Sequence, residues 1–319
     1  MMQKTDTVLV IGAGSIGERY IRNLWTLGYR NLVVLRQRNF PFRDIAEAKP
    51  VVVTSWEQVE ETMPRAAFVC TPTALHLANT FECLNRGIPV LIEKPLSNSM
   101  AQLQELKNLA KERRVLVQVG YMMRYHPLLK KIHEFAVSKK YGKLLHIHSH
   151  WGEYLPDWHP WEDYRQSYAA KKELGGGVAL TLSHDLDLSN WIAGSEIVQW
   201  NSIFNHNSTL QVDVEAGADF LLRYENGVTS HVHLNYYQKV KERYYQYIFD
   251  EASARIDFFK NELAITTTKE NTVDRLDSFD RNQLFISQIE DFFSNAVNPE
   301  QTNRIITESE QIIKMCTTT

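Results

Sequence analysis

Cysteine is scarce in this chain, since only Cys70, Cys83 and Cys316 occur among its 319 residues. Three cysteines at these spacings form neither a disulfide framework nor a paired-cysteine metal site, so we expect reduced thiols. The sequence also lacks a long apolar run and a signal-peptide pattern after its first residues. From these features we expect a cytoplasmic protein without a membrane partner.

A strong excess of charge of one sign is missing as well, because the formal net charge is only −3. Such a chain offers no basic field to nucleic acid or to an anionic membrane, and we expect neither as a partner. Hydrophobic residues at 44% and charged residues at 23% are ordinary globular values. The length is too great for one ordinary core and fits two domains.

Short apolar runs alternate with helical patterns in the first third of the chain. The runs that we expect to form strands are Val8–Ile11, Leu32–Leu35, Ala66–Cys70, Val90–Ile92 and Val115–Val119. Helical patterns extend to about Thr26 and over Ala74–Asn85 and Met100–Arg113, and Ser99 and Gln102 have capping-box spacing before the last of these. Strands that alternate with helices predict a parallel sheet with helices on both faces.

The pattern changes after about Tyr121. Helical patterns cover Pro127–Val137 and the stretch from Gly175–Gly177 to about Ile192, and Leu144–Trp151 alternates strictly between apolar and polar residues. Strand-like runs then follow at Val198–Phe204, Val212–Arg223, Val228–Tyr237, Tyr244–Asp250 and Ala254–Phe258, with a hairpin turn at Glu225-Asn226-Gly227. These hairpins predict a large, mainly antiparallel open sheet, closed by helices at Phe279–Ala296 and Thr302–Met315.

A glycine-rich turn follows the first expected strand. The segment Gly12-Ala13-Gly14-Ser15-Ile16-Gly17 fits G-x-G-x-x-G, in which the glycines allow the tight turn, the approach of a pyrophosphate and close helix packing. The helix that it opens offers N–H groups to phosphates. This context predicts a dinucleotide-binding Rossmann domain over residues 1–121 and an α+β substrate-binding and oligomerisation domain over 122–319. The alternative is a glycine turn without a ligand.

The end of the second expected strand bears on the choice of cofactor. An acid that holds the ribose hydroxyls is expected about 20 residues past the last glycine, but this sequence has Arg36-Gln37-Arg38 there. A guanidinium can pair with a 2′-phosphate, which a carboxylate would repel. We therefore predict NAD(P) as the cofactor, with Arg36 and Arg38 favouring NADP. The alternative is that both arginines are solvated and NAD is used.

A lysine follows another expected strand, in Glu93-Lys94-Pro95. Ligands bind at the carboxyl ends of strands in such sheets, and a lysine there can stabilise negative charge that develops on a substrate oxygen. The alternative is a surface lysine before a proline that starts a helix.

Several motifs in order resemble the glucose–fructose oxidoreductase, inositol dehydrogenase and rhizopine-catabolism (Gfo/Idh/MocA) family. They are Val10–Gly17, Thr71-Pro72-Thr73-Ala74-Leu75-His76, Glu93-Lys94-Pro95-Leu96, Gly120–Pro127, Gly175–Gly177 and Ser183–Asp187. The resemblance implies that Lys94 lies beside the nicotinamide in a cis peptide with Pro95, and that Thr71, Pro72 and His76 line the cofactor cleft with Glu93. It also implies that His184 is the general acid/base, with Tyr121 and Arg124 among the substrate contacts.

One departure from the family pattern concerns the acid one turn before this histidine. Many members carry an aspartate there, whereas this chain has Leu180 and Thr181. Either Asp185, Asp187 or Glu162 substitutes for it, or Lys94 and His184 work alone. Without the resemblance, His184 could also be a packing histidine on its helix.

An aromatic segment, His150–Arg165, contains three of the seven tryptophans, two prolines and alternating charges. We interpret it as a loop over the substrate cleft, because indoles suit the apolar faces of sugars and charged groups suit hydroxyls or a phosphate. The candidate contacts are Trp158, His159, Trp161, Tyr164 and Arg165. A subunit interface would have a similar composition.

The histidines His146, His148 and His150 alternate, and so do His231 and His233. Alternating residues share one strand face, and three imidazoles could bind zinc. We favour a polar sheet face or an interface and predict no metal.

Three functions remain open at this stage. The first is an NAD(P)-dependent dehydrogenase or reductase of a carbohydrate, with a nucleotide sugar or amino sugar as the leading substrate and a homodimer or homotetramer as the assembly. The second is a glycosidase-type elimination without net redox. The third is a non-catalytic dinucleotide-binding regulator.

Overall fold

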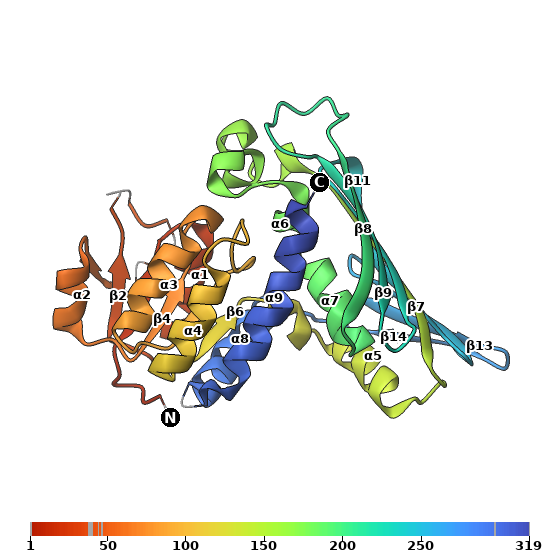
Figure 1. Cartoon of the computed structure of the whole chain (residues 1–319), viewed down its shortest axis with the longest axis horizontal. Helices are drawn as coiled ribbons and strands as arrows, with labels where there is room; N and C mark the ends of the chain where they lie inside the picture. The colour runs from red at the N-terminus through yellow and green to blue at the C-terminus, as the bar shows by residue number, and fades with distance from the viewer. Residues whose placement is uncertain (1, 38–40, 44, 46, 297, 319) are drawn as a thin grey trace. The chain divides into compact units, whose positions relative to one another are not determined.

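The computed structural model describes residues 2–37, 41–43, 45, 47–296 and 298–318. The chain forms two compact units, one made of residues 1–122 and 282–310 and the other of residues 123–281 and 311–319 (Figure 1). This division differs from the sequence-based one, which assigned residues 282–310 to the second domain.

The first unit contains a six-stranded sheet in which every neighbouring pair of strands is parallel. Its strand order is β3-β2-β1-β4-β5-β6. The strands are β1 (Val8–Ile11), β2 (Leu32–Leu35), β3 (Val51–Val53), β4 (Ala66–Val69), β5 (Val90–Ile92) and β6 (Val117–Val119). Strands β1, β2, β4, β5 and β6 are buried along their whole length, as expected of a parallel sheet covered on both faces.

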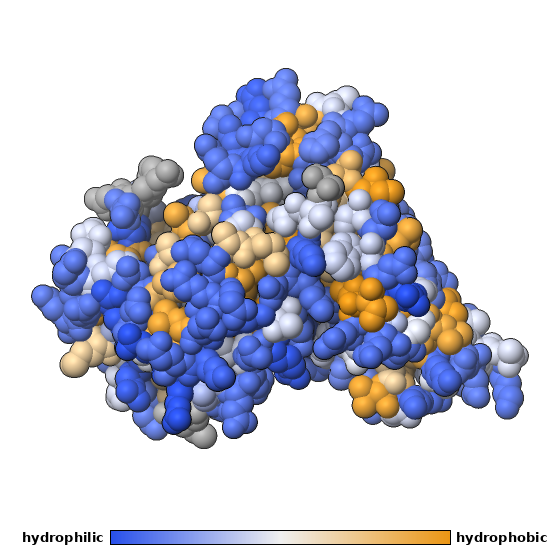
Figure 2. Space-filling view, in the orientation of Figure 1, coloured by the Kyte–Doolittle hydropathy of each residue, from blue (hydrophilic) through white to orange (hydrophobic). Residues whose placement is uncertain are grey.

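The helices of this unit are α1 (Ser15–Thr26), α2 (Trp56–Thr62), α3 (His76–Asn85), α4 (Leu103–Arg113), α8 (Asn282–Asn295) and the first part of α9 (Thr302–Thr317). Helices α1, α3, α4 and α8 bury several apolar residues each, and in Figure 2 helices α2, α3 and α4 carry mostly hydrophilic side chains on their visible surfaces. Strand order and helix placement together match the Rossmann arrangement predicted from the sequence.

Helix α8 packs on the first unit although it lies far away in the sequence. The Phe285 ring packs edge-on against Tyr20 of α1 at 5.8 Å, and Phe292 packs edge-on against Phe68 of β4 at 5.5 Å. The Asn282 side chain also donates to the Asn23 side-chain oxygen at 2.7 Å. These buried aromatic contacts are the physical reason why residues 282–310 do not belong to the second unit.

The second unit contains an eight-stranded sheet of order β14-β13-β12-β11-β7-β10-β9-β8. The strands are β7 (Leu144–Tyr154), β8 (Ile197–Asn205), β9 (Gly217–Tyr224), β10 (Thr229–Asn235), β11 (Tyr237–Phe249), β12 (Ala252–Asp257), β13 (Glu262–Thr267) and β14 (Asn271–Arg275). Only the β7–β10 pair is parallel among the pairings of this sheet. The sheet is therefore mainly antiparallel, as predicted.

Helices α5 (Pro127–Ser138), α6 (Val178–Thr181) and α7 (His184–Ala193) belong to this unit, together with the last part of α9. Helices α6 and α7 lie against strands β7, β9 and β10. The sheet face that they cover is buried and mostly apolar, with Ile147, Phe220 and Val232 among its residues. The opposite face carries the polar residues of the same strands, which matches the alternation seen in the sequence.

Several elements differ from the sequence-based prediction. Strand β3, helix α2 and strands β13 and β14 were not predicted; β3 is short with Val51 59% exposed, and β14 is a polar edge strand. The helix expected after Gly177 is broken into α6 and α7 at Leu182 and Ser183. The capping box at Ser99 was wrong, because α4 starts at Leu103 after Gln102, whose φ is 63° and whose side chain makes no capping bond.

Candidate functional site

The glycine turn between β1 and α1 combines tight packing with one open position. A Cβ at Gly12, whose φ is +89°, would lie 3.0 Å from the carbonyl of Cys70, and one at Gly17 would overlap the carbonyl oxygen of Gly12. In contrast, no atom lies within 4 Å of a Cβ built on Gly14. Gly12 and Gly17 are therefore required by the chain itself, whereas Gly14 leaves open space at the start of α1.

Ala13, Ser15 and Ile16 complete this turn, and Gly14 caps α1 without any side-chain hydrogen bond. The first N–H groups of a helix have no partner within the helix, and they carry a partial positive charge. The arrangement suits a phosphate that approaches the open side of Gly14.

The loops that follow β4 and β5 are joined by a buried histidine. His76 contacts the carbonyl oxygen of Pro95 through Nδ1 at 2.7 Å and that of Thr71 through Nε2 at 2.9 Å. Burial lowers the pKa of His76 to about 4, with a smaller contribution from Lys94. The imidazole is neutral, so only one of its nitrogens donates. His76 thus braces the two loops at the carboxyl edge of the sheet, where Thr71 and Pro72 lie.

The peptide bond between Lys94 and Pro95 is cis, as the resemblance implied. Lys94 follows β5, and Glu93 before it is buried. The Glu93 carboxylate accepts a hydrogen bond from the Tyr20 hydroxyl at 2.8 Å and one from the Lys94 backbone N–H at 3.3 Å. Burial raises the pKa of Glu93, and the charge of Lys94 and the Tyr20 hydroxyl oppose that rise.

Arg36 lies at the end of β2, where the sequence placed it. Its guanidinium stacks on the Phe42 ring at 4.0 Å, and its backbone N–H donates to the carbonyl of Val53 at 3.1 Å. Arg38, the second arginine of the NADP prediction, lies outside the described residues.

In the second unit, His184 is buried at the first position of α7. The preceding turn, α6, begins at Gly177, whose φ is +106° and which has the Glu215 carboxylate packed against it. The Glu215 carboxylate accepts from the N–H of Ala179 at 3.0 Å, and the Tyr236 hydroxyl donates to the carbonyl of Gly177 at 2.9 Å. Burial raises the pKa of Glu215.

The two aspartates that could replace the missing family acid are both held by arginines. Asp185 accepts from Arg243 at 2.6 Å and from the Ser149 hydroxyl at 2.7 Å. Asp187 accepts two bonds from Arg124, at 2.9 and 2.6 Å. Glu162, the third alternative, is exposed. Arg124, a predicted substrate contact, therefore binds an acid of its own unit. Tyr121 was also predicted to contact the substrate, and it is buried in the first unit.

The aromatic segment is only partly a loop, contrary to the expectation for residues 152–154. Residues 150–154 belong to β7, where they pair with β10 and β11, and Trp151 is buried beneath the Arg243 guanidinium at 3.6 Å. Trp158 packs edge-on against Tyr236 at 5.5 Å, and its indole N–H is buried without a partner among the described residues. Since Tyr236 also contacts Gly177, Trp158 lies near the turn that precedes His184.

The remaining predicted contacts of this segment lie in its outer part. Trp161 is 69% exposed, and His159 packs edge-on against it at 5.1 Å. The Tyr164 hydroxyl accepts from the backbone N–H of Gln211 at 3.2 Å, and Arg165 binds the Asp163 carboxylate at 2.7 Å. Tyr164 and Arg165 therefore make contacts that hold the loop itself.

The alternating histidines share one sheet face, as predicted. In the register of β7 and β10, His148 lies beside His231 and His150 beside His233, and both pairs of rings are 5.0 Å apart. The Asp219 side chain contacts His231 and His233 at 3.1 and 2.8 Å. Within the part of the chain that the structure describes, no cluster of three or more ligating side chains could hold a metal ion.

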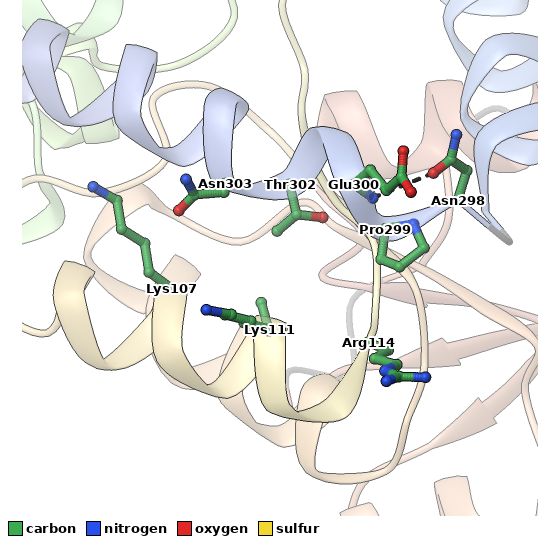
Figure 3. A pocket seen from close by; sticks show the side chains of 9 residues that line it. Lys107, Lys111, Arg114, Asn298, Pro299, Glu300, Thr302 and Asn303 are labelled. Atoms are coloured by element: carbon green, nitrogen blue, oxygen red, sulfur yellow. Dashed lines mark hydrogen bonds between the residues drawn. The ribbon is translucent and has the colours of Figure 1, made fainter.

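A groove of about 650 Å³ lies between α4 and the start of α9 in the first unit, lined by Lys107, Ala110, Lys111, Arg114, Asn298, Pro299, Glu300, Thr302 and Asn303 (Figure 3). Its polar groups serve the fold: Lys107 pairs with Glu310, and the Thr302 hydroxyl accepts from the N–H of Val117 at 3.1 Å. The predicted cofactor and substrate residues do not line this groove.

Sequence reasoning missed several residues beside the predicted site, namely Tyr20, Gln288, Glu215, Tyr236 and Arg243. Gln288 could have been noticed, because it interrupts the apolar stripe of Leu284, Phe285, Ile289 and Phe292 on α8. Glu215 and Arg243 lie on strands or loops far from His184 in the sequence, and nothing in their local pattern distinguishes them.

A parallel sheet of this strand order, with a glycine turn after its first strand, defines a dinucleotide-binding Rossmann unit. The sequence profile of the oxidoreductase family with an NAD-binding Rossmann fold matches residues 7–121, and that of the GFO/IDH/MocA C-terminal domain matches residues 129–255. The chain belongs to the Gfo/Idh/MocA oxidoreductase family.

Among curated relatives, myo-inositol dehydrogenase Hyg17 of Streptomyces leeuwenhoekii is 29% identical over 197 residues, which cover 60% of this chain and 57% of that protein. The match thus spans little more than half the length of that relative.

Two solved structures share the fold over nearly the whole chain. UDP-N-acetylglucosamine 3-dehydrogenase GnnA of Acidithiobacillus ferrooxidans has a TM-score of 0.78 at 18% identity and covers 97% of this chain and 95% of its own. GenD2 from gentamicin A biosynthesis, in complex with NAD, has a TM-score of 0.81 at 19% identity, with coverages of 99% and 93%. At these identities the likeness establishes the fold alone. None of the helices in the described ranges is long and apolar enough to cross a membrane.

Proposed function

We propose that this protein is a nicotinamide-dependent dehydrogenase or reductase that acts on a carbohydrate hydroxyl or ketone. One observation carries the proposal: Lys94 follows β5 at the carboxyl edge of the same parallel sheet whose β1–α1 turn leaves open space at Gly14. Ligands of such sheets bind at this edge. A relative that is a myo-inositol dehydrogenase supports the carbohydrate class.

The residues present fit a dinucleotide. Gly12–Gly17 would hold the pyrophosphate at the start of α1, and Thr71, Pro72, Glu93 and Lys94 would contact the rest of the cofactor at the ends of β4 and β5. When bound, the nicotinamide supplies the hydride chemistry that no side chain can provide.

Lys94 and His184 have separate roles in this proposal. The Lys94 ammonium donates to the reacting oxygen and stabilises negative charge that develops on it. The His184 imidazole accepts the hydroxyl proton during oxidation and returns it during reduction. The Asp185 and Asp187 carboxylates bind arginines, and in this proposal the lysine and the histidine perform the proton chemistry.

Within the carbohydrates, we propose a nucleotide sugar or an amino sugar. The support is the aromatic segment, where the Trp158 indole N–H is buried close to Tyr236 and lacks a partner among the described residues. An indole offers a flat apolar surface and one donor, which suits a sugar ring. The assembly that we propose is a homodimer or homotetramer.

For the cofactor, we propose a preference for NADP over NAD. Arg36 ends β2 where an acid would otherwise hold the ribose, and stacking on Phe42 orders its guanidinium. Fluorescence titration of the Arg36→Asp variant should show weaker NADP binding relative to NAD. Equal discrimination in variant and wild type would remove Arg36 from this role.

The activity is tested with a panel of nucleotide sugars, amino sugars and inositols by absorbance at the reduced-nicotinamide band. Lys94→Ala should lower turnover by at least about 100-fold and leave cofactor binding largely intact, while the exposed Lys111→Ala serves as the matched control. Full turnover in Lys94→Ala would overturn the proposal.

A further inference from the structure

A buried hydrogen-bond chain connects the backbone N–H of Lys94 to helix α8 within the first unit. It runs from Glu93 through the Tyr20 hydroxyl to the side chain of Gln288, and all three residues are buried, with Gln288 only 1% exposed. Gln288 is nearly 200 positions away from Glu93 in the sequence, so only the packing of α8 brings it here.

The directions of these bonds follow from the number of protons available. The Tyr20 hydroxyl has one proton, and it donates that proton to the Glu93 carboxylate. The Gln288 amide is therefore oriented with its nitrogen donating to the Tyr20 oxygen at 3.0 Å. Its oxygen then accepts from the backbone N–H groups of Tyr121 and Met122 at 3.2 and 3.3 Å. Each member of the chain is satisfied in this arrangement.

We propose that Tyr20 and Gln288 are positioning residues that hold the Glu93 carboxylate in place near Lys94, where its negative charge favours the protonated Lys94 amine. This inference rests on the proposed role of Lys94. A donor to the carboxylate favours its charged form, and a carboxylate favours the charged form of a neighbouring ammonium. Tyr20 thus acts on Lys94 through Glu93.

Neighbouring charged and polar groups act on Glu93 against the effect of its burial. Lys94 and Arg19 lower the pKa of its carboxyl, as does the Tyr20 hydroxyl, against the larger effect of burial. Cys70 also interacts electrostatically with Glu93, but burial raises the pKa of its thiol, so it stays neutral. The Tyr20 hydroxyl is therefore the neutral group whose removal changes Glu93 without removing a charge.

The test compares Tyr20→Phe, Glu93→Gln and Tyr29→Phe by two measurements. Tyr29→Phe is the matched control, since Tyr29 is a buried tyrosine of the same unit that packs on Phe293 of α8. The first measurement is the pH dependence of Lys94 acetylation by acetic anhydride, read by mass spectrometry, which needs no turnover. The second is the pH–rate profile.

We expect the midpoint of Lys94 acetylation to fall by up to about one pH unit in Tyr20→Phe and by at least as much in Glu93→Gln. Tyr29→Phe should leave the midpoint unchanged. In Tyr20→Phe and Glu93→Gln, the basic limb of the pH–rate profile should shift in the same direction as the acetylation midpoint. An unchanged midpoint in Tyr20→Phe would overturn the inference. A shifted midpoint with unaltered turnover in Lys94→Ala would instead overturn the proposed function and leave the hydrogen-bond chain intact.

Discussion

The guanidinium of Arg124 binds the carboxylate of Asp187 through two hydrogen bonds, at 2.9 and 2.6 Å. The Asp187 side chain is 1% exposed, and that of Arg124 is 25% exposed. Arg124 follows the first unit in the sequence, and Asp187 is one turn beyond His184 on α7. The pair thus fixes the start of the second unit to the helix that carries the proposed acid/base.

Asp187→Asn should destabilise the second unit by about 1–3 kcal/mol, because the partly buried Arg124 loses its ionic partner but remains partly hydrated. Urea unfolding measures this loss. Asp163→Asn is the control, since its pair with Arg165 is exposed and should contribute nothing measurable. Equal stability of Asp187→Asn and wild type would show that this pair does not hold α7.

Gly14→Ala and Gly17→Ala should separate binding from folding. A methyl group at Gly14 meets no atom within 4 Å, whereas one at Gly17 overlaps the carbonyl of Gly12. Gly14→Ala should therefore keep its thermal stability but lose dinucleotide affinity, measured by calorimetry, and Gly17→Ala should lose stability as well. Unaltered cofactor affinity in Gly14→Ala would argue against a phosphate at this turn.

His126 should make the second unit sensitive to acid. Burial and the nearby Arg243 lower the pKa of His126 to about 4. Neither ring nitrogen has a hydrogen-bond partner among the described residues. The unfolded chain binds this proton near pH 6.5, so stability falls as the pH decreases from about 6.5 to about 4, by up to about 3 kcal/mol. Denaturation midpoints of His126→Phe should depend less on pH over this range than those of the wild type. The same substitution at exposed His206 should not have this effect.

Glu215 should lower the stability of the second unit as the pH rises, which is opposite to the effect of His126. Because burial raises the pKa of Glu215, the folded state favours its neutral form, and its contribution to stability is lost as the pH rises through the folded-state pKa. Glu215→Gln keeps an acceptor for the N–H of Ala179 without the charge. Its melting temperature should exceed that of the wild type at pH 7 and match it at pH 4. The exposed Glu173→Gln should change neither value, and a lower melting temperature of Glu215→Gln at pH 7 would contradict this account.

The parts of the fold that could be predicted are those with strong local periodicity. Strands β1, β2 and β5 have the bounds expected from their apolar runs, and the face shared by His148 and His150 follows from alternation alone. Strand β14 could not be predicted in this way, because its polar residues are stabilised by pairing with β13 rather than by burial.

For the candidate site, the sequence indicated the residues within motifs but not the residues that hold them. The cis bond at Lys94 was implied by a local motif, whereas the contacts of His76 with the carbonyls of Pro95 and Thr71 were seen only in the structure. The partners of Asp185 and Asp187 depend on long-range contacts, which leave no trace in local spacing. The same is true of Tyr20 and Gln288, since the position of α8 on the first unit is decided by the packing of its phenylalanines.

The cover that α8 provides has a consequence for biosynthesis. A domain emerges from the ribosome in sequence order and usually folds as soon as its residues are available. Here Tyr20 and Phe68 are translated before the antiparallel sheet, but the phenylalanines that shield them, Phe285 and Phe292, are translated only after it. The nascent dinucleotide-binding unit must therefore wait, with an apolar face uncovered, until strands β7 to β14 have been synthesised.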